Sequence, residues 1–173
     1  MKIILETERL MLREMNQEDY EALCHMLQDE EVMYAYEHAF EEEEAHQWLD
    51  RQIQRYQEFG YGLWAVILKE NGEMIGQCGI TRQECDGKTV LEVGYLFEKA
   101  YWHRGYATEA AAACKEYAFE KLGAEEVYSI IRDNNQASQN VAKRNGMVCR
   151  GMFVKHYYHM DMPHLIFSVK REN

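Results

Sequence analysis

The sequence predicts an α/β (α+β) fold, with one domain over residues 1–173 and a mixed, mainly antiparallel sheet of about six to seven strands flanked by about four helices. Two hairpin signals divide residues 62–97 into three strands, and helical segments then alternate with strands. The chain has one proline and no Gly/Ser-rich stretch, so we expect no linker between two domains. A length of 173 residues suits a single hydrophobic core.

The N-terminal part predicts one strand and two helices. Residues 10–13 read as the first strand, and Asn16 reads as the N-cap of a helix whose apolar residues follow at helical spacing. The second helix is expected over residues 42–59, because an apolar stripe runs along it and Gly60 is a suitable stop.

The middle part predicts an antiparallel meander. Residues 63–68 are apolar on both alternating faces, which indicates a sheet covered on both sides. Asn71-Gly72 and Asp86-Gly87 are hairpin signals that lead into strands at 74–80 and 90–97.

The C-terminal part predicts two helices and three further strands. The first helix is rich in alanine and ends at Gly123. The expected order is a helix at 106–122, a strand at 127–131, a helix at 135–144, and strands at 148–154 and 165–169.

Composition restricts the partners that the protein is expected to have. The formal net charge of −11 repels a phosphate backbone, so we expect no nucleic acid and expect a cationic amine or basic peptide to be attracted. No apolar run reaches the ~20 residues that span a bilayer, and the N-terminus does not resemble a signal peptide, so a cytoplasmic protein is expected. The five cysteines form no C-x-x-C pair, which argues against a disulfide framework or a zinc site.

The chemistry is expected where a strand, residues 92–97, runs through a loop into a helix at Gly105. The first N–H groups of a helix have no partner within it, and the helix dipole there favours an anion. Gly105 allows a bulky anion to approach the main chain, and Arg104 adds a positive charge. These features describe a cradle for a pyrophosphate, although a capped helix after an ordinary glycine turn would use the same residues. The spacing fits neither the Walker pattern nor the dinucleotide fingerprint.

These residues resemble the GNAT family of N-acetyltransferases. The family signature Q/R-x-x-G-x-G/A aligns with Trp102-His-Arg-Gly105-Tyr-Ala107, where the last two places match and the first does not. The extended form Trp-x-x-Gly-Tyr-Ala-Thr-Glu-Ala is typical of the branch that contains the ribosomal-protein N-terminal acetyltransferases (RimJ/RimL-like). Two further blocks resemble that branch: the opening at residues 7–13, and Asn135-Gln-Ala-Ser138 followed by Val141 and Gly146-Met147.

The resemblance implies a transferase that uses acetyl-CoA. In the family, the strand before the cradle separates from its parallel neighbour, here residues 127–131, and the pantetheine arm lies in the gap. The resemblance implies that Tyr95, Leu96 and Phe97 pair with this arm and that Asn135 helps to hold it. It places the pyrophosphate on the N–H groups of Arg104, Gly105, Tyr106, Ala107 and Thr108.

The implied reaction is direct attack of a primary amine on the thioester. Glu92 is the candidate general base, because several relatives have a glutamate in this strand that acts as a base. Burial would raise the pKa of Glu92. A glutamate that makes a structural hydrogen bond is the other interpretation.

The general acid is less clearly indicated. The tyrosine that many relatives place seven residues after the asparagine falls on Ala142, so the chain departs from the pattern. Ser138 is the candidate substitute, and a serine that caps a helix is the alternative. Tyr106, Tyr157 and Tyr158 are further hydroxyl donors.

The acceptor is expected to contact Tyr34, Tyr36, residues 37–40 and the late strands, and it could be a protein N-terminus or a small amine. Alternatives are a silent acyl-CoA sensor, an aminoglycoside- or streptothricin-type resistance enzyme, and a plain interaction domain. A homodimer fits the family. No metal is expected, because strand spacing scatters the late histidines and the acid over both faces: His156, His159, Asp161 and His164.

Overall fold

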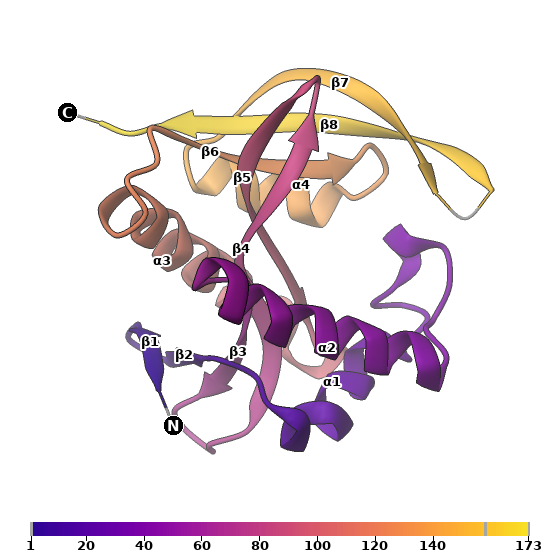
Figure 1. Cartoon of the computed structure of the whole chain (residues 1–173), viewed down its shortest axis with the longest axis vertical. Helices are drawn as coiled ribbons and strands as arrows, with labels where there is room; N and C mark the ends of the chain where they lie inside the picture. Colours follow the sequence, from indigo (N-terminus) through magenta and orange to yellow (C-terminus); the bar gives the residue numbers. More distant parts are fainter. Residues whose placement is uncertain (1, 158, 173) are drawn as a thin grey trace.

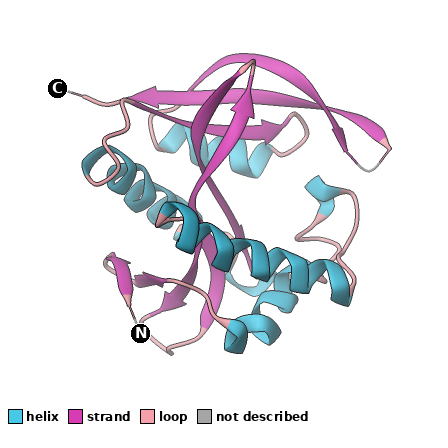
Figure 2. Cartoon of the chain, viewed as in Figure 1, coloured by secondary structure: helices cyan, strands magenta, loops and turns pink. Residues whose placement is uncertain are grey.

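The computed structural model describes residues 2–157 and 159–172. Within them, the chain forms one sheet of eight strands in the order β1-β2-β3-β4-β5-β6-β8-β7 (Figure 1). All neighbours are antiparallel except β5 and β6, which are parallel. Four α-helices flank this sheet, so the predicted α/β class and the mixed, mainly antiparallel sheet are confirmed (Figure 2).

The elements follow one another without long irregular segments. The strands are β1 (Ile3–Glu6), β2 (Leu10–Arg13), β3 (Leu63–Leu68), β4 (Met74–Cys85), β5 (Lys88–Phe97), β6 (Glu126–Arg132), β7 (Val148–Tyr157) and β8 (Met160–Lys170). The helices are α1 (Tyr20–Leu27), α2 (Glu42–Phe59), α3 (Tyr106–Glu120) and α4 (Gln136–Arg144), with short 3-10 turns η1 (Gln17–Asp19), η2 (Tyr34–Tyr36) and η3 (Lys99–Tyr101).

The structure corrects the sequence prediction at β1 and at Asn16, and it extends β4 and β8 well beyond the predicted strands at 74–80 and 165–169. The eighth strand, β1, was not predicted, because it is four residues long, pairs only with β2 at the sheet edge and exposes Ile3. Asn16 is an N-cap as expected, but it caps the 3-10 turn η1 through a capping box with Asp19, and α1 begins only at Tyr20.

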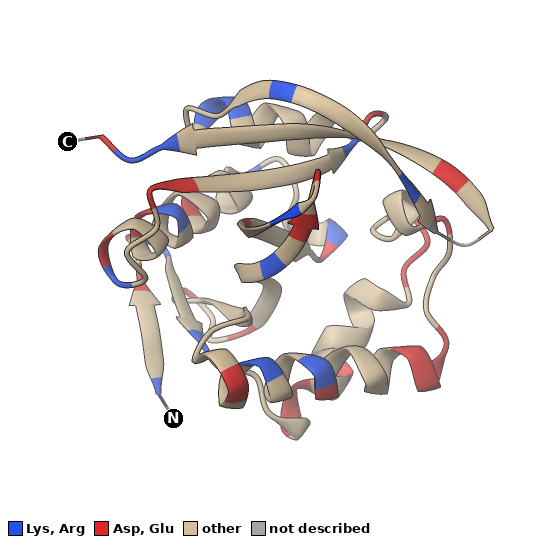
Figure 3. Cartoon of the chain, turned by 45° about the horizontal axis from the view of Figure 1, so that its top comes forward, with Lys and Arg blue, Asp and Glu red and all other residues tan. Residues whose placement is uncertain are grey.

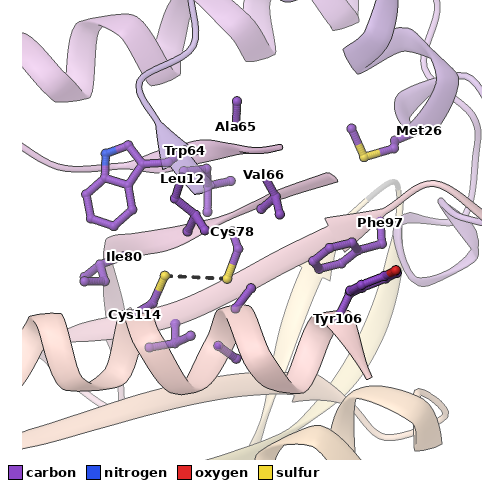
Figure 4. Packing of buried hydrophobic residues seen from close by; sticks show 14 of the residues in the cluster. Leu12, Met26, Trp64, Ala65, Val66, Cys78, Ile80, Phe97, Tyr106 and Cys114 are labelled. Atoms are coloured by element: carbon purple, nitrogen blue, oxygen red, sulfur yellow. Dashed lines mark hydrogen bonds between the residues drawn. The ribbon is translucent and has the colours of Figure 1, made fainter. Parts of the chain in front are cut away.

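The helices lie in two layers, one on each face of the sheet. Neighbouring residues of β4 point to opposite faces. Gln77 accepts a hydrogen bond from the indole of Trp48 on α2, whereas the sulfur of Cys78 lies 3.6 Å from that of Cys114 on α3 (Figure 4). α1 and α2 therefore cover one face, and α3 and α4 cover the other.

The main core lies on both faces of β3 and β4. Every residue of β3 is buried, as its continuous apolar pattern predicts. Trp64, Cys78 and Ile80 pack towards α3, whose buried positions are mostly small, such as Ala110 and Cys114 (Figure 4). Small side chains let α3 lie close to the sheet, and this fixes the position at which its N-terminus begins. None of the described helices is long and apolar enough to span a membrane.

Candidate active site

The parallel strands β5 and β6 separate almost as soon as they meet. Their only register pair among the described residues is Glu92 with Tyr128. Beyond it, side chains replace the ladder: the N–H of Ile130 donates to Oε2 of Glu92 at 2.6 Å, and the hydroxyl of Ser129 donates to the carbonyl of Val93 at 2.8 Å. The backbone groups at the split are thus satisfied, and the strands can diverge around a cavity.

The cavity has a volume of about 940 Å³ and two distinct halves. The α3 half is lined by the end of β5, the start of α3 and the face of α4 that begins at Asn135. The α2 half is lined by one face of α2, by η2 and by residues of β7 and β8. Glu92 lies where the halves meet. Its strand, β5, borders the α3 half, whereas its side chain is on the α2 face of the sheet, as is that of Thr81, its partner on β4.

The carboxyl group of Glu92 has an unusual environment. Burial raises its pKa to about 7, although the N–H of Ile130 and the charges of Lys155 and Arg55 act in the opposite direction. A carboxyl with this pKa is partly ionised at neutral pH, so it can take up a proton and release it again. The structural hydrogen bond and the properties of a base are therefore found in the same side chain.

The cradle, residues 104–108, has the backbone that the sequence predicts. Gly105 is the N-cap of α3 and has a φ of +83°, a left-handed conformation that favours glycine. The first helical hydrogen bond runs from the N–H of Glu109 to the carbonyl of Gly105 at 3.0 Å. The N–H groups of Tyr106, Ala107 and Thr108 precede that bond, and all three residues line the α3 half of the cavity.

Residues from the N-terminus hold the cradle in place. Glu109 accepts hydrogen bonds from the hydroxyl of Thr7 at 2.5 Å, from the backbone N–H of Arg9 at 3.0 Å and from its Nε at 2.8 Å. Arg9 also donates to the carbonyl of Arg104 at 2.9 Å and lies 4.3 Å above the ring of Tyr106. Burial acts to raise the pKa of Glu109, but the bonds from Thr7 and Arg9 keep it below its ordinary value. Two sequence motifs about 100 residues apart thus form one structural unit, which we call the brace (Thr7, Arg9 and Glu109).

The start of α4 faces the same half of the cavity. Asn135 is the N-cap of α4, and its side chain accepts a hydrogen bond from the N–H of Ser138 at 3.2 Å. Both residues line the cavity, whereas Ala142, the position of the missing tyrosine, is buried.

Tyr95 contributes more than the backbone that the resemblance assigns to it. Its hydroxyl is buried and makes no well-formed hydrogen bond among the described residues. Burial raises the pKa of Tyr95 above its ordinary value, and the neighbouring hydroxyl of Ser138 acts in the opposite direction. Tyr95 pairs with Cys78, so it lies on the α3 face, opposite to Glu92. Leu96 and Phe97 also line the cavity, and the indole N–H of Trp102 donates to the carbonyl of Phe97 at 2.9 Å.

The predicted acceptor residues are brought together only in part. Tyr34 and Tyr36 line the α2 half, but residues 37–40 do not contribute to the lining. Phe40 instead packs edge-on against Tyr36 and Trp48, and Glu37 forms an ion pair with Arg132. Tyr158 lies outside the described residues, as does the side chain of Tyr157.

The face of α2 that lines the cavity was not predicted. It consists of Trp48, Arg51, Gln52 and Arg55, at the i, i+3, i+4 and i+7 spacing of one helix face. On the helix, this aromatic and polar stripe lies beside the apolar one. The helical spacing of these four residues in the sequence is the signal that could have revealed the face.

The late histidines and acid do not meet as a metal site. Nδ1 of His156 lies 2.5 Å from Asp161, and Nδ1 of His164 lies 2.8 Å from the carbonyl of Met162. Over the described ranges, no group of three His, Cys, Asp or Glu side chains is arranged to hold a metal ion.

The sheet splits at its parallel pair, and a helix N-terminus and a carboxyl group of raised pKa lie at the split among the described residues. The chain belongs to the GNAT family, because residues 9–148 match the acetyltransferase (GNAT) domain. It is 35% identical over 147 residues to the protein YkkB of Bacillus subtilis (strain 168). The aligned residues cover 84% of this chain and 86% of the relative.

Solved structures share the fold over nearly the whole chain. An acetyltransferase from Agrobacterium tumefaciens str. C58 superposes with a TM-score of 0.83 at 26% identity, covering 99% of this chain and 95% of the other. RimL, a ribosomal L7/L12 α-N-protein acetyltransferase in complex with coenzyme A, superposes with a TM-score of 0.80 at 18% identity, covering 98% of both chains. The likeness to RimL concerns the fold alone.

Proposed function

We propose that the protein transfers an acetyl group from acetyl-CoA to a primary amine, with Glu92 as the general base. The observation that carries this proposal is the position of Glu92 at the split between β5 and β6, with a pKa of about 7 and the cradle in the same cavity. An acyl-CoA sensor, the alternative from another class, would have no use for a carboxyl group that ionises near neutral pH.

The α3 half of the cavity suits the donor. The first N–H groups of α3 and the positive end of its dipole favour a pyrophosphate. Arg104 does not line the cavity, and its guanidinium lies 5.8 Å from the centroid of the Tyr101 ring, so we assign it a charge at the rim of the cradle. Tyr95, Leu96 and Phe97 lie beyond the split, where the edge of β5 is no longer covered by β6 and can pair with an amide-containing arm. Asn135 lines the same half, so we assign it to the arm as well. RimL, which shares this fold, has been solved with coenzyme A.

The proposed reaction proceeds in one addition and one elimination. The amine nitrogen attacks the thioester carbonyl, a C–N bond forms and the C–S bond breaks. Glu92 takes the proton that the nitrogen loses, and the CoA thiolate leaves. The hydroxyl of Ser138 relays a proton from solvent to that thiolate and regains its own proton from water, and Tyr95, beside it, orients the serine. Glu92 and Tyr95 lie on opposite faces of β5. The proton from the amine is therefore taken up on the α2 side, and the proton for the thiolate is supplied on the α3 side.

The proposal is tested first by calorimetry with acetyl-CoA. Gly105→Glu places a carboxylate at the cradle, and we expect it to lower the affinity by about 100-fold or more because like charges repel in a partly desolvated site. Gly60→Glu is the matched control, because Gly60 has nearly the same φ, +82° against +83°, and lies at the far end of α2 with open space around it. Both variants carry the same backbone strain, so only a loss specific to Gly105→Glu supports the cradle.

Turnover decides whether the bound acetyl-CoA is a substrate. We expect the wild-type protein to consume its thioester in the presence of a primary amine, and to form the N-acetyl product in equal amount. Binding without turnover over a broad amine panel would favour the sensor. Failure of the wild-type protein to bind acetyl-CoA would overturn the proposed function.

The oligomeric state is a separate prediction. β7 is an edge strand, and it exposes Val148, Met152 and Val154. An exposed apolar edge is suited to pairing with a second copy, so the expected homodimer would form there. Sedimentation of wild-type protein and of Met152→Lys checks it, since a charge at this edge should favour the monomer.

A further inference from the structure

The charge of the cavity is opposite to that of the whole chain. The chain carries a net charge of −11, with acidic residues spread over the ribbon and gathered where α2 begins (Figure 3). Among the described residues that line the cavity, Glu92 is the one carboxylate. Five cations line it: Arg51, Arg55, Arg132, Arg144 and Lys155.

Within the described part of the chain, four of these five cations have no carboxylate partner, and three of the four lie on the α2 side of the cavity. Arg132 is paired with Glu37, and Arg144 ends α4 on the α3 side. Among the described residues, Arg55 donates to the amide oxygen of Gln52 at 3.3 Å, and the ammonium of Lys155 lies 6.0 Å from the centroid of the Phe153 ring. Among the residues that the structure describes, no carboxylate forms an ion pair with Arg51. Arg51 is exposed, whereas Arg55 and Lys155 are half-buried. A partly desolvated cation without a counter-ion destabilises a protein, so the position of Arg55 and Lys155 calls for a reason in binding.

Two of the three cations, Arg55 and Lys155, act on Glu92, and Arg51 lies beside Arg55. Arg51 and Arg55 lie one turn apart on the lining face of α2. Burial, and then the like charge of Arg51, lowers the pKa of Arg55. Lys155 and Arg55 both act electrostatically on Glu92, so the charges of α2 and β7 meet at the carboxyl group that accepts the proton. An anion placed here would relieve the repulsion between Arg51 and Arg55.

We propose that the acceptor carries a carboxylate close to its amino group, as a free amino acid does, and that Arg55 and Arg51 bind that carboxylate while Glu92 faces the amine. This inference rests on the proposed function and names its substrate class. A guanidinium presents paired N–H donors that match the two oxygens of a carboxylate, and Lys155 supplies a third charge. Tyr34, Tyr36 and Trp48 border the same half and provide apolar surface for a side chain of the acceptor.

The inference departs from the expectation that the net charge suggests. A field of −11 attracts cationic amines to the outside of the protein, but inside the α2 half a polyamine or an aminoglycoside would meet three unpaired cations and one carboxylate. A protein N-terminus has its own carboxylate far from the amine, so it would leave Arg51 and Arg55 without a partner as well.

Matched pairs of acceptors test the proposal. With acetyl-CoA as donor, each of the common amino acids is compared with its own carboxamide, which keeps the amine and the side chain and loses the charge. We expect kcat/KM to be at least about 10-fold higher for the acid of the preferred pair, because buried charge pairs discriminate strongly against an analogue that lacks the charge. Phosphoethanolamine, spermidine and a dipeptide amide complete the panel.

The variants assign the effect to the α2 face. Arg55→Gln should reduce the preference for the acid to about threefold or less, and Arg51→Gln should reduce it in the same direction. Arg55→Glu should reverse the preference in favour of the carboxamide, which mere loss of structure would not do. Lys121→Gln, at the exposed end of α3, removes a cation far from the cavity and should leave the preference unchanged.

Binding provides a readout that does not need turnover. Calorimetry on the CoA-loaded protein compares the N-acetyl amino acid with the N-acetyl carboxamide, and the acid should bind at least about 10-fold more tightly. Tighter binding or faster acetylation of the carboxamides, of spermidine, of the dipeptide amide or of phosphoethanolamine would overturn the inference and leave the proposed function intact. If acetyl-CoA itself did not bind, the proposed function would fail first, and the two failures are thus distinguishable.

Discussion

The two halves of the cavity are built in different ways. The α3 half contains residues that are nearly consecutive in the chain, His103 and 105–108, and the brace fixes them through hydrogen bonds to Glu109 at 2.5–3.0 Å. The α2 half is assembled from η2, α2, β7 and β8, and three of its charged groups have no ionic partner within the described residues. One half is held in place by hydrogen bonds within the protein, whereas the other brings together cations from separate elements that an anionic ligand would neutralise. The first is suited to a donor of fixed chemistry, and the second is suited to select an acceptor.

The largest expected effect is at Glu92, where the halves meet. Glu92→Gln keeps an oxygen for the N–H of Ile130 and removes the base, so we expect kcat/KM to fall by about 100-fold or more. In the wild-type protein, kcat/KM should rise with pH and reach half of its plateau near pH 7, because Glu92 must be ionised to act. That inflection should disappear in the variant. Steady-state rates from pH 5.5 to 9 measure it, and Glu84→Gln, at an exposed carboxylate of β4, is the control.

The same variant distinguishes a base from a structural glutamate through stability. The pKa of Glu92 is raised from 4.5 to about 7 in the folded protein, so ionisation of Glu92 lowers the free energy of unfolding. The stabilisation from protonated Glu92 is fully present below about pH 4.5, declines as the pH rises to about 7 and is lost above that. Glu92→Gln should therefore be more stable than the wild-type protein at pH 8, by about 2–3 kcal/mol, and should lose this advantage near pH 5. Urea unfolding at both values measures it; a variant that is less stable at both would indicate a purely structural role.

The next effect concerns the brace. Glu109→Gln weakens the bonds to Thr7 and Arg9 without changing the shape of the side chain, so the cradle should lose its fixed position. We expect acetyl-CoA to bind about 10-fold more weakly and the free energy of unfolding to fall by about 1 kcal/mol, since the pair is partly exposed. Glu116→Gln, on the exposed side of the same helix, is the matched control. Unchanged affinity combined with lower stability would mean that the brace supports the fold and not the site.

The contrast between the halves also explains what the sequence could predict. Turns such as Asn71-Gly72 and Asp86-Gly87 are specified locally, so the meander and the bounds of α2 and β3 could be derived. The cradle could be derived for the same reason, because helix start, glycine and charge are adjacent in the chain. β1 could not, since a short edge strand carries too little pattern.

Long-range contacts set the limit for the site. No local pattern says that Thr7 meets Glu109, 102 residues away, although both lie in motifs that the sequence revealed. Nor does spacing alone say whether the Trp48–Arg55 face of α2 meets solvent or a cavity. Packing of α2 on the sheet decides that, through contacts such as the bond between Trp48 and Gln77. The net charge does not identify the acceptor for a related reason, because it sums over the whole chain and says nothing of the charges in a cavity.

The smallest expected effect concerns the leaving group, on the α3 side of the split. A thiol ionises near pH 8.5, so a thiolate leaves readily and needs little help from an acid. Ser138→Ala should therefore lower kcat by only about 3- to 10-fold, with little change in the KM for acetyl-CoA. Tyr95→Phe, which removes the buried hydroxyl beside Ser138, should lower kcat by about 2- to 3-fold. If Tyr95 acts by orienting Ser138, the double variant will be no slower than Ser138→Ala alone. If the two losses in kcat instead multiply in the double variant, each hydroxyl acts on the thiolate by itself.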